Sequence, residues 1–186
     1  MSLPSLAGTT DDDRVQIRRA DVVDALRIAD LHVQSWKVAY RGLLPQDLLD
    51  GLDPQQRVPR WEATIDRSTW PERGTLVAEE ADRLVGFANI CPTRDDDQDP
   101  ASVGEVASFY VSPDVWGQGV GRALMVASCE TLIAACFLTA SLWVLDTNAR
   151  AIGFYQALGW RDDGAVKNDI MGGAPIRDLR YRRTLT

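Results

Sequence analysis

The chain has 186 residues, of which 45% are hydrophobic and 25% are charged, a composition typical of a soluble globular protein of single-domain length. Its net charge of −7 argues against a nucleic-acid or anionic-membrane surface and slightly favours a cationic partner. The longest low-charge run, residues 123–145, is interrupted by Glu130, and the first residues lack a basic, apolar leader pattern. We therefore expect a cytoplasmic protein without a membrane partner. With His32 as the only histidine, we expect no metal site.

The N-terminal half predicts a tail, one strand, several helices and a hairpin. Residues 1–13 are small and polar and end in three aspartates, so we expect a disordered tail followed by a single domain over residues 14–186. Apolar residues alternate at the start of this domain and then recur at helical spacing behind a capping Asp21. The expected elements are a strand at 14–19, helices at 21–38, from 45 and at 54–67, and hairpin strands at 74–80 and 83–91.

Two charged segments have alternative interpretations. Residues 94–100 carry four aspartates, which could attract a polyamine or a lysine-rich partner, although we favour a solvated loop tip. Arginines 177, 180, 182 and 183 lie on the last predicted strand, and we expect them to form an exposed face rather than a binding surface.

The central strand, residues 103–111, carries the carboxylate of greatest chemical interest. Strict alternation places Glu105 on the same face as Phe109 and Val111, unless a bulge resets the register. A carboxylate among apolar neighbours is desolvated in its charged form and is suited to take up a proton. Glu105 is therefore a candidate general base, and the alternatives are a solvent-exposed strand end or an ion pair with an arginine.

A glycine-rich turn follows this strand and leads into a helix over residues 119–135. Gly117, Gly119 and Gly121 let the backbone approach an anion, and the first N–H groups of the helix have no partner within it. A Rossmann fingerprint counted from Gly117 would put Arg122 at its last glycine, and the turn has no P-loop lysine. The remaining alternatives are a diphosphate site built from backbone N–H groups, with Arg122 at its rim, and a glycine turn without a ligand.

The C-terminal part continues the β-α-β pattern. Residues 139–146 are almost all apolar and predict a buried parallel strand. Thr147 and Asn148 begin a helix that ends at Gly159, and strands are expected at 165–171 and 176–185.

Two motifs in this order carry a resemblance. Gln118-Gly-Val-Gly-Arg-Ala-Leu124 after a strand, followed by Asn148-Ala-Arg-Ala-Ile-Gly-Phe-Tyr-Gln-Ala-Leu-Gly-Trp160, is similar to the GNAT superfamily of acyl-CoA-dependent N-acetyltransferases. Trp116 departs from the arginine or glutamine with which the family's loop begins. The resemblance implies an α/β (α+β) fold with a mixed sheet of six to seven strands, about four or five flanking helices and splayed central strands.

The resemblance also implies roles for individual residues. The glycine turn becomes the acetyl-CoA diphosphate site, Asn148 contacts the pantetheine arm, and Tyr155 assists the departing thiolate. The helix-loop-helix before the hairpin covers the acceptor pocket in many members, which makes His32, Trp36, Tyr40 and Arg41 acceptor-site candidates. The expected CoA-binding residues are Phe109, Tyr110, Val111, Trp116, Gly117, Gln118, Gly119, Val120, Gly121, Arg122 and Asn148.

The implied activity is transfer of an acetyl (acyl) group from acetyl-CoA to a primary amine by direct attack in a ternary complex. In this scheme the backbone N–H near Val111 stabilises the oxyanion, Glu105 takes the proton and Tyr155 assists the leaving group. A small-molecule or peptide amine is expected as acceptor, without a metal or nucleic acid, and a homodimer is an open outcome because dimers are common in the family. The alternative is a catalytically silent acyl-CoA-binding sensor or interaction protein.

Overall fold

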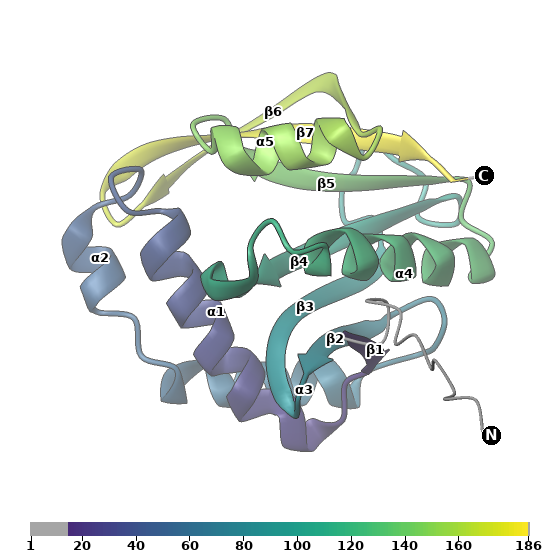
Figure 1. The fold of residues 1–186 in the computed structure, drawn as a ribbon. Coiled ribbons are helices and arrows are strands. Elements are labelled where there is room, and N and C mark those ends of the chain that lie inside the picture. The colour runs from purple at the N-terminus through teal and green to yellow at the C-terminus, as the bar shows by residue number, and fades with distance from the viewer. Residues whose placement is uncertain (1–14, 186) are drawn as a thin grey trace, which may run out of the picture.

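The computed structural model describes residues 15–185, so the expected tail at 1–13 lies outside the described residues. One seven-stranded sheet has the order β1-β2-β3-β4-β5-β7-β6, and helices cover both of its faces (Figure 1). The strands are β1 (Gln16–Arg19), β2 (Gly74–Glu80), β3 (Arg83–Pro92), β4 (Val103–Val111), β5 (Thr139–Leu145), β6 (Arg161–Met171) and β7 (Ala174–Thr184). The helices are α1 (Ala25–Ala39), α2 (Gln46–Asp50), α3 (Val58–Asp66), α4 (Val120–Ala134) and α5 (Ala149–Ala157). The predicted mixed α/β fold is confirmed.

The core is divided between the two faces of the sheet. On one face, α1 and α3 pack Ile28 and Trp61 against Val77 and Phe87. On the other, apolar residues of α4 and α5 pack against β4, β5 and β7, with the fully buried Trp160 at the end of α5. Because each helix presents one apolar stripe to the sheet, these contacts fix the helices against it. Within the described residues, no helix is both long enough and apolar enough to span a membrane.

A β-bulge resets the register of β4. Asn89 of β3 pairs with Ser108, whereas the next residue of β3 pairs with Val106, so that Ala107 is the extra residue. Phe109 consequently packs against Phe154 of α5, on the same side as Val106, which packs with α4 residues. Glu105 and Phe109 therefore do not share a face, and the expected strict alternation is wrong.

The central strands separate after a short ladder. Only three residue pairs join β4 to β5 in parallel, and the last is Glu105 with Ser141. Figure 1 shows the two strands diverging toward α1 and the start of α4. The backbone groups of β4 that face β5 beyond Glu105 consequently have no strand partner, as the predicted splayed centre requires.

The acidic loop is bound to the C-terminal strands. Asp95 is buried and accepts hydrogen bonds from Trp143 Nε1 at 3.0 Å and Lys167 Nζ at 2.5 Å. Arg180 is only 6% exposed and pairs with Asp95 at 3.3 Å and with Asp97 at 2.7 Å. The prediction of an exposed Arg180 is wrong, because its charge is neutralised by the buried Asp95 and by Asp97. The rest of the loop is solvated as predicted, since Asp96, Asp97 and Asp99 are exposed.

Candidate active site

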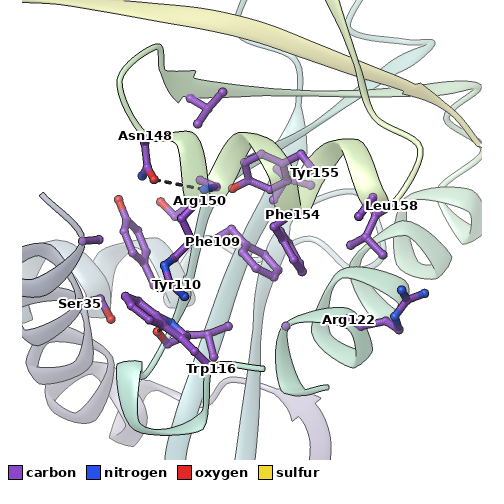
Figure 2. A pocket seen from close by; sticks show the side chains of 18 of the residues that line it. Ser35, Phe109, Tyr110, Trp116, Arg122, Asn148, Arg150, Phe154, Tyr155 and Leu158 are labelled. Carbon is purple, nitrogen blue, oxygen red and sulfur yellow. Dashed lines mark hydrogen bonds between the residues drawn. The ribbon is translucent and has the colours of Figure 1, made fainter. Parts of the chain in front are cut away.

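A cavity of about 460 Å³ lies at the gap between β4 and β5 (Figure 2). Its walls come from the end of α1, the second half of β4, the turn before α4, β5 and the first turns of α5. Parallel β4 and β5 would normally be joined by hydrogen bonds here, so the splay creates the space. Phe109 and Phe154 stack at 5.6 Å between ring centroids and form part of an apolar wall.

The glycine turn closes one end of the cavity. Gly117 and Gly119 have φ angles of 79° and 89°, in the left-handed region that favours glycine. Gly119 is the N-cap of α4 and supplies no side-chain cap, so the first N–H groups of this helix remain available. A Cβ on Gly121 would lie 3.3 Å from the Phe154 ring, so glycine permits α4 to approach α5 closely. A helix N-terminus with free N–H groups can bind an anion here.

Trp116 and Arg150 form a stacked pair beside this turn. The Trp116 ring is held by its Nε1, which donates to the Val111 carbonyl at 2.9 Å. The Arg150 guanidinium lies 4.3 Å from the centre of the Trp116 ring, and both residues line the cavity. The sequence prediction missed Arg150, because only the folded chain brings the first turn of α5 next to residue 116.

Tyr155 projects from α5 into the same cavity. Its ring is 7% exposed and contacts Phe109 and Phe154 edge-on. Burial raises the pKa of Tyr155 well above its ordinary value of 10.0, so the hydroxyl keeps its proton at neutral pH. Asn148 lines the cavity and also caps α5, where its side-chain oxygen accepts from Ala151 N at 3.1 Å.

Most of the expected CoA-binding residues share this cavity. Gln118 and Val120 are the exceptions: Gln118 Nε2 donates to the Asp114 carbonyl at 3.0 Å, and Val120 is buried in the core. Those that line the wall are Phe109, Tyr110, Val111, Trp116, Gly117, Gly119, Gly121, Arg122 and Asn148. Their part in ligand binding stays a prediction.

Only one acceptor-site candidate lines the cavity. Tyr40 stands in the wall, and burial raises its pKa. Trp36 lies behind the wall, where its Nε1 donates to the Tyr110 hydroxyl at 2.9 Å, and Arg41 is exposed outside the cavity. Tyr40 and Tyr110 thus line the cavity beside the end of α1.

His32 belongs to the core instead. It is 8% exposed and packs among the rings of Trp36, Trp61, Phe87 and Tyr110. Burial, reinforced by nearby arginine charges, lowers the pKa of His32 to about 3, so the imidazole is neutral at physiological pH. His32 therefore does not line the cavity, although it packs against Tyr110, which does.

Glu105 lies outside the cavity wall and is 2% exposed. Its Oε2 accepts hydrogen bonds from the backbone N and the Nε of Arg94 at 3.1 Å and 3.0 Å, and its Oε1 binds the same guanidinium. The structure thus shows the arginine ion pair that was the alternative to a free carboxylate. Among the described residues that line the cavity, none is Asp, Glu or His.

Two further wall residues carried no sequence signal. Ser35 of α1 is buried, and its Oγ has no hydrogen-bond partner in the described part of the chain. Trp143 of β5 is fixed by Asp95 and by Lys167, whose Nζ lies 4.0 Å from the ring centre. Only the folded chain shows that these two residues line the same cavity. Within residues 15–185, no cluster of three or more His, Cys, Asp or Glu side chains is arranged to hold a metal ion.

The sequence model of the acetyltransferase (GNAT) family matches residues 36–160. The chain belongs to this family. A GNAT relative, the uncharacterized N-acetyltransferase YuaI of Bacillus subtilis, is 33% identical over 144 residues, which cover 77% of this chain and 78% of the relative. A mycothiol acetyltransferase of Acidimicrobium ferrooxidans is 35% identical over 97 residues, which cover 51% of this chain but only 30% of that protein. These matches support an acetyltransferase.

Solved GNAT structures share the fold. The PaiA N-acetyltransferase of Thermoplasma acidophilum in complex with coenzyme A has a TM-score of 0.70 at 16% identity, over 91% of this chain and 98% of that one. YncA of Salmonella typhimurium with acetyl-CoA has a TM-score of 0.69 at 20% identity, over 94% and 95% of the two chains. At these identities the likeness establishes the GNAT fold of this chain and leaves its substrates open.

Proposed function

We propose that this chain transfers an acetyl group from acetyl-CoA to a primary amine by direct attack in a ternary complex. One observation carries the proposal: a single cavity combines the open N-terminus of α4 with the protonated hydroxyl of Tyr155. An anion-binding end and a proton donor in one cavity suit a phosphate-bearing thioester that must release a thiolate.

The donor would bind along the splayed edge of β4. Its diphosphate would accept hydrogen bonds from the first N–H groups of α4, with Arg122 adding positive charge. Such charge-assisted bonds contribute about 1.5–3 kcal/mol each, so several of them hold the donor firmly. The pantetheine arm would use the backbone groups of β4 near Phe109 that have no partner on β5, with Asn148 beside it.

The chemical step forms one bond and breaks another. The neutral amine nitrogen bonds to the thioester carbonyl carbon, and the N–H near Val111 stabilises the oxyanion. The carbon–sulfur bond then breaks, and the sulfur takes a proton from the Tyr155 hydroxyl. Water then reprotonates Tyr155. The nitrogen loses its proton to water, because the described cavity wall has no carboxylate or imidazole. Glu105 would receive that proton only through such a water path.

Two alternatives, a covalent acyl-enzyme and a catalytically silent sensor, have less support. The cavity wall contains no cysteine, and the only histidine is buried outside it, which argues against a covalent acyl-enzyme. A catalytically silent acyl-CoA sensor would keep the donor cavity but would not need the Tyr155 hydroxyl. A homodimer, a cytoplasmic location and the choice between small-molecule and peptide acceptors stay predictions.

The test is thiol release from acetyl-CoA with a panel of amines, combined with calorimetry of acetyl-CoA binding. Tyr155→Phe should lower kcat about a hundredfold and leave acetyl-CoA affinity unchanged, because the hydroxyl acts on the leaving group. Tyr181→Phe is the matched control, since this buried tyrosine lies outside the cavity and binds Gln156.

Each outcome has a distinct meaning. Binding of acetyl-CoA without turnover of any amine would favour the sensor. Equal rates for Tyr155→Phe and the parent protein would remove the hydroxyl from the chemistry. Failure of the parent protein to bind acetyl-CoA would refute the proposed donor.

A further inference from the structure

The Arg150–Trp116 pair joins two walls of the cavity. Arg150 comes from the first turn of α5, and its guanidinium lies over Trp116, which belongs to the turn before α4. Figure 2 shows the Arg150 side chain reaching from α5 toward the Trp116 ring. Because the Trp116 ring is itself anchored to the Val111 carbonyl, the guanidinium has a fixed support.

No carboxylate in the described residues neutralises Arg150. It forms no ion pair or hydrogen bond there, although the chain as a whole carries a net charge of −7. A cation in the first turn of a helix also opposes the helix dipole, so this position costs stability. Stacking on Trp116 offsets part of that cost and leaves the N–H edges of the guanidinium free to donate.

The surroundings of the pair favour an anion. Arg122 and the N-terminus of α4 border the same cavity, and no acidic residue of the described chain lines it. Two arginines and a helix N-terminus facing one space produce a positive potential there. A phosphate oxygen would accept from the planar guanidinium edge in a bidentate arrangement.

We infer that Arg150, supported by Trp116, binds a phosphate group of the acyl donor. This inference rests on the proposed function, which supplies a phosphate-bearing donor. The phosphate could be the diphosphate or the ribose 3′-phosphate, which share the same chemistry. In either case α5 contributes to donor affinity through Arg150 as well as to protonation of the leaving thiolate through Tyr155.

The experiment measures the affinity of three thioesters by calorimetry: acetyl-CoA, acetyl-dephospho-CoA and S-acetylpantetheine. Arg150→Gln should weaken acetyl-CoA binding about ten- to hundredfold and leave S-acetylpantetheine binding unchanged, because the latter has no phosphate. If Arg150→Gln weakens acetyl-dephospho-CoA binding as much as acetyl-CoA binding, the bound group is the diphosphate. If the substitution leaves acetyl-dephospho-CoA affinity unchanged, the bound group is the 3′-phosphate. Arg67→Gln is the control for removing one exposed positive charge away from the cavity.

A second set of variants tests the role of the ring. Trp116→Leu should weaken acetyl-CoA binding in the parent but add little to Arg150→Gln, because the two side chains act as a pair. Trp116→Phe keeps an aromatic face and should retain more affinity than Trp116→Leu. Thermal melts confirm that each variant is folded.

The inference is overturned if Arg150→Gln binds acetyl-CoA like Arg67→Gln, or if it loses equal affinity for S-acetylpantetheine. Either result leaves the proposed acetyl transfer intact as long as the parent protein binds acetyl-CoA. Lack of binding by the parent would instead refute the proposed donor.

Discussion

Gly119 is the position where one methyl group should disturb the donor site most directly. It is the N-cap of α4, and its φ of 89° and ψ of −15° are readily adopted by glycine. A Cβ at this position would meet nothing within 4 Å, so Gly119→Ala introduces backbone strain without a steric clash. The effect of the substitution can therefore be assigned to the backbone conformation.

The expected magnitude follows from that conformation. A left-handed alanine costs roughly 1–2 kcal/mol relative to glycine. If the turn keeps its shape, the free energy of unfolding falls by this amount. If the turn relaxes, the first N–H groups of α4 lose alignment, and acetyl-CoA affinity falls about tenfold for each 1.4 kcal/mol lost.

The assay combines chemical denaturation with calorimetry of acetyl-CoA binding. Gly153→Ala is the matched control, because this glycine lies within α5, has nothing within 4 Å of an added Cβ and has no positive φ. The control should be stabilised by roughly 0.5–1 kcal/mol, since alanine is the better helix former.

The reasoning fails if Gly119→Ala and Gly153→Ala change stability in the same direction and leave acetyl-CoA affinity equal. That result would mean that the left-handed geometry of the turn is not required. A loss of stability alone would locate the cost in the fold, and a loss of affinity alone would locate it in the anion site.

Two further predictions concern buried titratable groups. The pKa of His32 is about 3 in the fold against an ordinary value of 6.5, so the unfolded chain binds a proton first as the pH falls. Stability should therefore drop by roughly 3–5 kcal/mol between pH 6.5 and pH 3, and His32→Phe should flatten this slope in acid denaturation. Glu105→Gln should weaken the bonds to Arg94 and cost roughly 1–3 kcal/mol of stability. In thiol-release assays, kcat/KM should still rise with pH in this variant, because the attacking amine must be neutral. Disappearance of that rise would instead identify Glu105 as the base.

Local sequence patterns predicted most of the elements. Asp21 and Asp24 form the expected capping arrangement before α1, with Asp24 accepting from the Asp21 N–H at 2.9 Å. Ala81 and Asp82 form the predicted hairpin turn with φ angles of 48° and 64°. The glycine turn and the cap of α5 also lie where the motifs placed them. These features depend on residues close in sequence, whose spacing the chain itself displays.

The errors lie where distant segments meet. The bulge at Ala107 depends on pairing with β3, so alternation along one strand could not predict which face carries Glu105. The pairing of Arg180 with Asp95 joins residues separated by 85 positions, and each charge taken alone suggested an exposed surface. His32 was an acceptor-site candidate, but only tertiary packing decided that its side chain enters an aromatic core.

By itself the sequence determined the glycine turn between β4 and α4, the motif at residues 148–160 and hence the resemblance to the family. Tertiary structure alone decided which side chains share the cavity: Arg150 lies over Trp116 there, while Glu105 lies outside it and forms an ion pair with Arg94. The physical reason is that backbone conformation responds to local residue types, whereas the state of a charged side chain depends on which partners folding brings within a few ångströms.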